Sequence, residues 1–375
     1  MNIKRVYADL GSKLEENKAL IIYGPRQVGK TTLVQDYLKT CPYKYRLDSG
    51  DNIVIHEILG SQNFDKLKKY AEGYELIVID EAQRIPQIGQ GLKILVDTIP
   101  GIRIIATGSS SFELAGQVGE PLTGRKTSLT LFPISQLELN ELYNKQELRA
   151  KLDEYLIFGG YPEVITSQTR DKKIALLEEL VHSYLLKDIL ELEQVKSSKL
   201  LLDLLRLLAL QIGSEVSMHE LARQLGIDAK TVARYIDLFE KAFVLYNLRG
   251  FSRNLRNEIT KKSKYYFYDT GLRNAVIANF NDLNLRNDVG ALWENFLFIE
   301  RLKKRNYSHI PANQYFWRTW DQKEIDLIEE REGNLFAYEF KFTSDKAKVP
   351  KDWKEAYPDS EFQLINRDNY LEFIV

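Results

Sequence analysis

The chain has 375 residues, a formal net charge of −1, 44% hydrophobic residues and 28% charged residues. This balance is typical of globular proteins, and the length predicts two or three domains. A near-neutral chain does not bind polyanions by its overall charge, so a nucleic-acid surface would need basic residues gathered in one segment.

The sequence predicts a reducing compartment and no membrane partner. The single cysteine, Cys41, cannot form an internal disulfide, and the four histidines show no metal-binding spacing. The N-terminus carries charges and lacks an apolar run of signal-peptide length. No stretch approaches the roughly 18 uninterrupted apolar residues of a membrane span. We therefore expect a cytoplasmic protein.

Residues 1–135 predict an α/β domain. Near-continuous apolar runs such as 76–79 suit parallel strands that are covered by helices on both faces. The expected architecture is an open, doubly wound parallel sheet. Strands are predicted at Ala19–Tyr23, Tyr43–Asp48, Leu76–Asp80, Ile102–Thr107 and Thr127–Leu131.

A phosphate-binding motif lies between the first predicted strand and the helix that follows it. The motif satisfies GxxxxGK[ST] in the strand–loop–helix context that this pattern requires. Glycines let backbone N–H groups approach phosphate oxygens, and a helix N-terminus favours anions. Lys30 is expected to contact the β- and γ-phosphates and Thr31 to bind Mg²⁺. The predicted nucleotide site comprises Gly24, Pro25, Arg26, Gln27, Val28, Gly29, Lys30, Thr31 and Thr32.

Two adjacent carboxylates end the third predicted strand. Asp80 and Glu81 would lie at the C-terminal edge of the sheet, where ligands bind in this architecture. We expect Asp80 to hold the magnesium shell and Glu81 to polarise the attacking water. With the phosphate loop, they predict ATP or ADP and Mg²⁺ as cofactors and ATP hydrolysis as the activity.

Two further positions are candidates for contact with the γ-phosphate. The fourth strand runs into the hydroxyl-rich segment 107–111, where Ser109 is expected either to sense the γ-phosphate or to cap the next helix. Arg125 precedes the fifth strand and is expected either to supply a cation to the transition state or to be a solvated surface arginine.

The middle of the chain predicts helices and then a winged helix. Apolar residues at three- and four-residue spacing predict helices at 137–156, 172–193 and 199–210, with a turn at 158–162. Two short helices that meet at Gly226 follow, resembling a helix-turn-helix. Ser217 and Asp228 are their expected N-caps.

A basic segment accompanies these two helices. Residues 249–273 carry seven Lys or Arg side chains against two carboxylates, and DNA binds such clusters through counterion release. The alternative is a protein-contact module with a solvated basic loop, which Asp237 and Glu240 on the second helix favour. The predicted DNA contacts are Lys230, Arg234, Lys261, Lys262 and Lys264.

Residues 285–375 predict a second α/β unit. Asp326, followed by Glu339 and Lys341, resembles the Asp…Glu-x-Lys core of restriction-type nucleases. Glu294, on a predicted helix, would complete an acidic pocket for Mg²⁺. The alternative is a structural ion pair in a domain that does not cut. A helix is predicted at 292–304 and strands at 315–318, 324–328 and 335–342.

These motifs together resemble a widespread prokaryotic family of AAA-type ATPases with a C-terminal domain of uncertain function. Besides the phosphate loop and 79–83, the resemblance rests on 107–110, 124–125, 132–135, 158–162 and 266–272, and it covers nearly the whole chain. It implies an ATPase core over 1–135, a helical lid and connector over 136–212, a winged-helix-like segment over 213–284 and a restriction-endonuclease-like domain over 285–375.

Three functions are compatible with this organisation. The first is a Mg²⁺-dependent ATPase whose nucleotide state moves the winged-helix and nuclease-like assembly on DNA. The second is a slow ATP-dependent switch that acts through protein partners. The third is an ATP-gated, metal-dependent nuclease. Each leaves room for a homo-oligomer.

Overall fold

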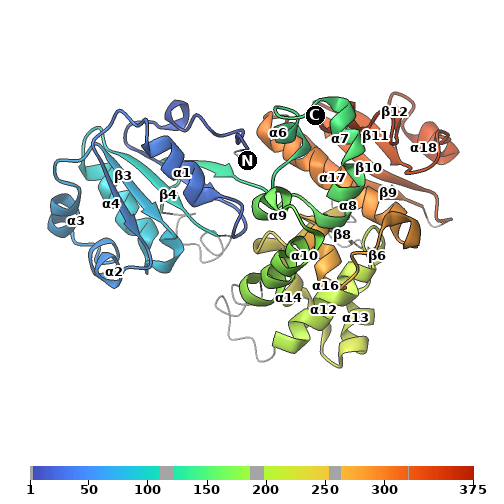
Figure 1. Ribbon diagram of the computed structural model, residues 1–375, viewed down its shortest axis with the longest axis horizontal. Coiled ribbons are helices and arrows are strands. Elements are labelled where there is room, and N and C mark those ends of the chain that lie inside the picture. The colour runs from blue at the N-terminus through green and yellow to red at the C-terminus, as the bar shows by residue number, and fades with distance from the viewer. Residues whose placement is uncertain (1–2, 110–120, 186–197, 253–262, 320) are drawn as a thin grey trace.

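The structure is a computed structural model that describes residues 3–109, 121–185, 198–252, 263–319 and 321–375, with the backbone alone at 183–185. Figure 1 shows two lobes. The smaller lobe holds β3, β4 and α1–α4, and the larger lobe holds the labelled elements from α6 onward. The described N-terminal segment, which begins at Ile3, lies between the lobes and contacts both.

The smaller lobe is built on a parallel sheet of five strands in the order β2-β3-β4-β1-β5. Each strand lies within two residues of its predicted bounds, so the sequence-based prediction of a P-loop NTPase-like core is confirmed. The strands are β1 Lys18–Tyr23, β2 Tyr45–Ser49, β3 Leu76–Asp80, β4 Arg103–Thr107 and β5 Lys126–Thr130.

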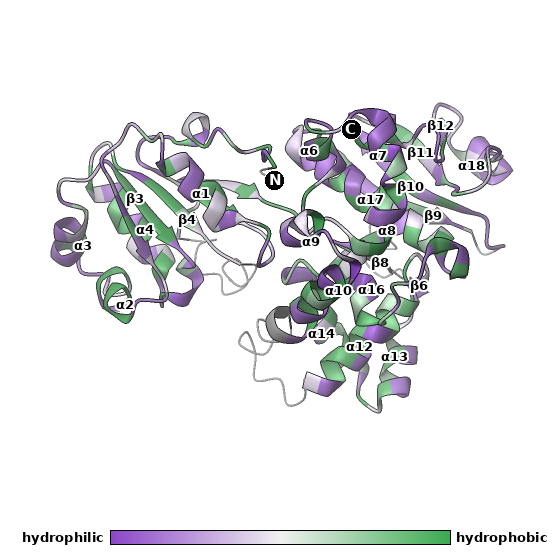
Figure 2. Ribbon diagram, in the orientation of Figure 1, coloured by the Kyte–Doolittle hydropathy of each residue, from purple (hydrophilic) through white to green (hydrophobic). Residues whose placement is uncertain are grey.

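The side chains of each strand alternate between the two faces of this sheet, and buried hydrophobic residues on both faces explain why helices cover both. Successive side chains of a strand point to opposite faces. Ile22 belongs to the buried cluster that contains α1 (Lys30–Leu38), whereas Ile21 belongs to the cluster that contains α4 (Ile88–Thr98). Figure 2 shows the hydrophobic strands β3 and β4 and the largely hydrophilic helix α3. Among the described residues of this lobe, α2 Ile53–Leu59 and α3 Phe64–Ala71 are further α-helices.

The chain then forms a series of short helices. Residues 137–156 were expected to form one helix and form three, because Asn144 accepts hydrogen bonds from the backbone N–H groups of Gln146 and Glu147 and so begins a new helix. The end of the helix predicted at 172–193 lies outside the described residues. The helices are α6 Gln136–Leu139, α7 Lys145–Ala150, α8 Leu152–Phe158, α9 Pro162–Thr166, α10 Arg170–Glu179 and α12 Ser198–Leu210, with a π-helical segment at Leu180–Leu185.

The larger lobe contains a seven-stranded sheet in the order β12-β11-β10-β9-β7-β8-β6. β7 pairs with β9 in parallel, so the segment predicted as a winged helix and the C-terminal unit share one sheet. Ser217 and Asp228 cap α13 and α14 as predicted. The strands are β6 Glu215–Val216, β7 Leu245–Gly250, β8 Ser263–Phe267, β9 Asn313–Arg318, β10 Glu324–Arg331, β11 Asn334–Phe340 and β12 Glu361–Ile365. The helices are α13 Met218–Leu225, α14 Ala229–Lys241, α16 Thr270–Val276, α17 Val289–Tyr307, α18 Lys351–Ala356 and α19 Tyr370–Ile374.

Two glycine-containing motifs meet in the core of this lobe. The carboxylate of Asp269 accepts hydrogen bonds from Gly160 N at 2.7 Å and from Leu272 N at 2.9 Å. A Cβ on Gly271 would lie 2.1 Å from the carbonyl oxygen of Phe158, so only glycine permits this approach. The segments 158–162 and 266–272 therefore have a structural role, since they join the α8–α9 turn to α16.

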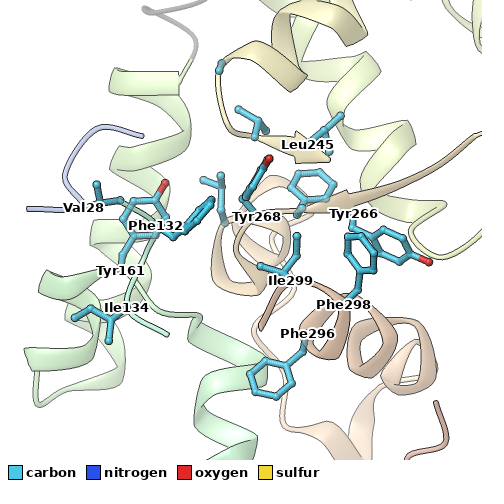
Figure 3. Close-up of a cluster of buried hydrophobic side chains, with 14 of the residues drawn as sticks. Val28, Phe132, Ile134, Tyr161, Leu245, Tyr266, Tyr268, Phe296, Phe298 and Ile299 are labelled. Atoms are coloured by element: carbon cyan, nitrogen blue, oxygen red, sulfur yellow. The ribbon is translucent and has the colours of Figure 1, made fainter. Parts of the chain in front are cut away.

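Aromatic side chains extend the contact between these segments through the core. Phe132, which follows β5, stacks on Tyr268 with ring centroids 5.9 Å apart, and Tyr266 stacks on Phe298 at 4.5 Å (Figure 3). Val28 of the phosphate loop belongs to the same buried cluster, which therefore extends from the smaller lobe into the larger one. In the described part of the chain, no helix has both the length and the apolar character needed to cross a membrane.

Candidate functional site

The phosphate loop connects β1 to α1 in a conformation that requires glycine. Gly24 has φ +146°, and a Cβ there would lie 2.1 Å from the carbonyl oxygen of Leu131. Gly29 has φ +94° and precedes the first residue of α1. The Lys30 side chain is buried, and its ammonium donates to the carbonyl oxygens of Gly24 and Pro25, at 2.8 Å each. The cation predicted to bind phosphate thus lies across the loop.

Three hydroxyl and carboxylate side chains meet beside this loop. Thr31 Oγ1 donates to Asp80 Oδ2 at 2.9 Å, and Thr107 Oγ1 donates to Asp80 Oδ1. Thr107 also accepts a hydrogen bond from the backbone N–H of Glu81 at 3.2 Å. A hydroxyl and a carboxylate next to a phosphate loop are the oxygen ligands that Mg²⁺ takes in P-loop proteins. The donor set therefore fits a magnesium ion bound with nucleotide.

Thr107 is the contact in this group that sequence reasoning did not single out. The hydroxyl-rich segment 107–111 was predicted as a whole, and Ser109 was chosen from it. Ser109 is buried near the end of β4, and its sensing role stays a prediction. Ser110 and Ser111 lie outside the described residues. The sequence could have identified Thr107, because it is the last residue of a predicted strand and the C-terminal end of that strand faces the phosphate loop.

Glu81 adopts a backbone conformation that is uncommon for glutamate. Its φ is +50°, in the left-handed region, and such strain is found most often at functional sites. The loop after β2 approaches closely here, since a Cβ on Gly50 would lie 2.2 Å from the carbonyl oxygen of Glu81. Gln83 Nε2 donates to Glu81 Oε2 and orients the carboxylate. The role of Glu81 as the water-polarising base stays a prediction that this geometry supports.

Arg125 lies at the wrong edge of the sheet for its predicted role. Ala19 N donates to Arg125 O at 2.9 Å, which places Arg125 beside the start of β1, whereas the phosphate loop follows the end of β1 at Tyr23. Five residues of strand separate the two edges by about 16 Å. The Arg125 guanidinium pairs with Asp97 instead. Within the chain, Arg125 therefore does not lie beside the phosphate loop, and its role as a cation for the transition state stays a prediction that this geometry does not support.

Two cavities flank the phosphate loop. One, of about 400 Å³, lies between the N-terminal segment, α1 and α9, and is lined by residues that include Ile3, Thr32 and Pro162. The other, of about 340 Å³, adjoins Thr31 and Asp80. Small-molecule sites in proteins are typically about 300–1,000 Å³, so the first cavity is large enough for a nucleoside.

Arg5 connects the phosphate loop to the larger lobe, and no sequence signal identified it. Its Nη1 donates to Val28 O at 2.5 Å, its Nη2 to Phe132 O at 2.6 Å, and its Nε lies 2.7 Å from Glu138 Oε1. Glu138 is fully buried, and with Ser135 it forms the capping box of α6. These partners lie 23 to 133 residues away along the chain, so no local pattern reveals the contact.

The structure brings together the residues predicted as a nuclease-like site. Asp326 Oδ2 accepts from Phe340 N at 2.7 Å, and Lys341 Nζ lies 2.6 Å from Glu339 Oε1. Burial, with the nearby carboxylates of Glu294 and Glu339, raises the pKa of Asp326 well above its usual range. Burial also raises the pKa of Glu339. The four predicted residues therefore interact as one acidic cluster.

Two of the basic residues counted toward a DNA surface are internal. Lys264 on β8 is fully buried among carboxylates of the acidic cluster, so the prediction that it contacts DNA is wrong. Arg273 is buried and pairs with Asp288. Lys230 and Arg234 on α14 are exposed, and Lys261 and Lys262 lie outside the described residues. The basic patch is therefore smaller than the sequence count predicted.

Three stretches of the chain match family models. Residues 16–140 match the AAA domain, residues 149–284 match a domain of unknown function (DUF8612), and residues 289–371 match another domain of unknown function (DUF4143). The AAA match supports the predicted resemblance to AAA-type P-loop ATPases and, with it, nucleotide binding by the smaller lobe. The winged-helix and nuclease-like assignments stay predictions.

Similar proteins align with most of the chain. An uncharacterized protein of Mycobacterium tuberculosis is 28% identical over 340 residues, which cover 90% of this chain and 73% of the relative. An uncharacterized protein of Methanocaldococcus jannaschii is 24% identical over 387 residues, covering 97% and 84%. One from Haemophilus influenzae is 25% identical over 377 residues, covering 95% and 88%. The similarity therefore extends beyond the AAA domain into the larger lobe.

Proposed function

We propose that the protein is a Mg²⁺-dependent ATPase whose nucleotide state acts on the larger lobe and, through it, on DNA. The observation that carries the ATPase proposal is the contact of Thr31 and Thr107 with Asp80 beside the phosphate loop. Thr31 lies in the first turn of α1, and Asp80 and Thr107 are the last residues of β3 and β4. A chance glycine loop would not be expected to have this arrangement next to it.

Different residues of the site would bind the phosphates, bind Mg²⁺ and activate the attacking water. Backbone N–H groups of 24–31 and the Lys30 ammonium would bind the phosphates, and Thr31 and Asp80 would hold Mg²⁺. Bound Mg²⁺ neutralises charge on the phosphate oxygens. Glu81 would orient a water and accept its proton. Thr107 would help to position both residues, because it contacts the Asp80 carboxylate and the Glu81 backbone.

The 400 Å³ cavity supports a nucleoside site between the lobes. The cavity is lined by Ile3, Lys4, Arg5 and Ala8 of the N-terminal segment, by α1 and by Pro162 and Thr166 of α9. A base bound there would contact both lobes at once. Binding of ATP or ADP would then favour one relative position of the lobes over others, which is how a nucleotide state can be transmitted.

For the larger lobe we propose a winged helix joined to a restriction-endonuclease-like unit. The order α12-β6-α13-α14-β7-β8, with β8 paired to both β6 and β7, supports the first assignment. The order α17-β9-β10-β11-α18-β12 supports the second. Exposed Lys230 and Arg234 on α14 favour DNA as the partner. We place the unit boundaries at 1–135, 136–212, 213–284 and 285–375.

ATP turnover with and without duplex DNA tests this proposal. Phosphate release that depends on Mg²⁺ and is stimulated by DNA is the expected result. Tight ATP binding with negligible turnover in both conditions would contradict the ATPase proposal and favour a nucleotide-dependent switch that acts through protein partners.

A further inference from the structure

A lysine from β8 reaches into the acidic cluster of the C-terminal unit. Lys264 has no exposed side-chain surface, and its ammonium lies 3.1 Å from Glu294 Oε1 and also pairs with Glu324. The electrostatic influence of Asp326 reaches it as well. The lysine therefore lies among three carboxylates that come from α17 and β10.

A second residue of β8 engages the same cluster. Tyr266 is fully buried, and its hydroxyl donates to Glu294 Oε1 at 2.5 Å. Gly213, in the turn before β6, leaves room for the Glu294 carboxylate, since a Cβ there would lie 3.0 Å from Glu294 Oε2. The Glu294 carboxylate is therefore held by residues outside the C-terminal unit. Lys264, Tyr266 and Gly213 all pack against it.

The charges of the cluster show why an internal cation is needed. Four carboxylates gather here, and the cations Lys264, Lys341 and the partly exposed Arg318, which pairs with Glu324 at 3.8 Å, accompany them. Buried carboxylates that lack a cation are strongly destabilising. Lys341 is 44% exposed and pairs with Glu339 near the surface, whereas Lys264 is wholly enclosed. The carboxylates are Glu294, Glu324, Asp326 and Glu339.

We propose that Lys264 is the resident cation of the acidic cluster and takes the place of a divalent metal there. Its ammonium would repel a divalent ion that bound to the same oxygens, and it already neutralises Glu294 and Glu324. Within the described ranges, no group of three or more His, Cys, Asp or Glu side chains is arranged to hold a metal ion. The cluster thus ties β8 to the C-terminal unit and does not cut nucleic acid.

Mn²⁺ binding to the full chain without nucleotide tests this proposal. Free Mn²⁺ is measured by electron paramagnetic resonance for wild type, Asp326→Asn, Lys264→Met and the double variant. Wild type and Asp326→Asn should bind equal amounts. Lys264→Met, which keeps the length of the side chain and removes the charge, should gain one Mn²⁺ that the double variant loses. Mn²⁺ should also raise the thermal midpoint of Lys264→Met by several degrees and leave that of wild type unchanged.

Lys341→Met is the matched control, because it removes the other ammonium of the cluster and leaves Lys264 in place. It should gain no Mn²⁺. A Mn²⁺ ion on wild type that Asp326→Asn removes would overturn the proposal, whether or not Lys264→Met folds. A folded Lys264→Met that gains no Mn²⁺ would overturn it as well, and so would a gain by Lys341→Met equal to that of Lys264→Met.

Discussion

Arg5 and Glu138 form a buried ion pair, with Nε and Oε1 2.7 Å apart, between the N-terminal segment and the first helix of the larger lobe. The same guanidinium donates to the carbonyl oxygen of Val28 in the phosphate loop. One side chain therefore contacts both the phosphate loop and α6. The relationship gives a physical route by which nucleotide binding can act on the larger lobe.

Replacing Arg5 with Ala should lower both stability and ATP affinity. The change leaves the Glu138 carboxylate buried without its cation, which costs about 3–5 kcal/mol of unfolding free energy. It also removes the donor that holds Val28 O, so ATP should bind more weakly. Urea unfolding and ATP titration measure the two effects. Arg84→Ala, which removes an exposed ion pair with Asp51, should cost less than about 1 kcal/mol. Equal losses in the two variants would contradict the proposed role of Arg5.

Substitutions at Lys30 and at Glu81 should affect ATP binding and ATP hydrolysis differently. Lys30→Ala should weaken ATP binding about 10- to 100-fold, because a charge-assisted hydrogen bond contributes roughly 1.5–3 kcal/mol. Glu81→Gln should bind ATP as wild type does and hydrolyse it about 100- to 10,000-fold more slowly, as expected on loss of a general base. Nucleotide titration and single-turnover hydrolysis distinguish these outcomes. Wild-type hydrolysis by Glu81→Gln would rule out its proposed role.

Thr107→Val tests the hydroxyl that lies between Asp80 and Glu81. Valine keeps the shape and loses both hydrogen bonds, so the carboxylates should be less well positioned while the phosphate loop is unchanged. We expect hydrolysis to be about 10- to 100-fold slower, because hydrogen bonds to charged groups contribute roughly 1.5–3 kcal/mol. ATP affinity should change less than the rate. Thr98→Val, on the outside of α4, is the control and should leave both quantities unchanged.

DNA binding should depend on exposed cations of α14. Replacing Lys230 and Arg234 with Ala should weaken binding to all sequences and reduce the magnitude of the salt slope of log K by about 2, since about one counterion is released per phosphate contact. Fluorescence anisotropy over a salt series measures both. Lys68→Ala with Lys69→Ala on α3 makes the same charge change in the other lobe and should have no effect. If the two double variants behave alike, α14 is not the DNA-binding helix.

The sequence predicted local features well and long-range contacts poorly. The strands of the first sheet and the caps at Ser217 and Asp228 were predicted, because hydrophobic runs and capping residues act over a few positions. The convergence of Asp326 and Glu339 was predicted from strand order. Lys264 was misassigned because a charge count cannot distinguish a solvated lysine from one enclosed by carboxylates, and the fold alone decides which it is.

Asp326 should make the stability of the protein fall as pH rises. Burial and the neighbouring carboxylates raise its pKa in the folded state, so the folded protein binds this proton more tightly than the unfolded chain does. The resulting stabilisation is complete below the ordinary pKa of aspartate, about 4, and is lost as pH rises through the raised value. Asp326→Asn cannot ionise and should lack this loss, so its stability relative to wild type should increase from pH 4 toward pH 8. Urea unfolding at several pH values measures the difference, and exposed Asp359→Asn is the control. A wild-type advantage over Asp326→Asn that grows with pH would show that the carboxylate is ionised and stabilising in the fold.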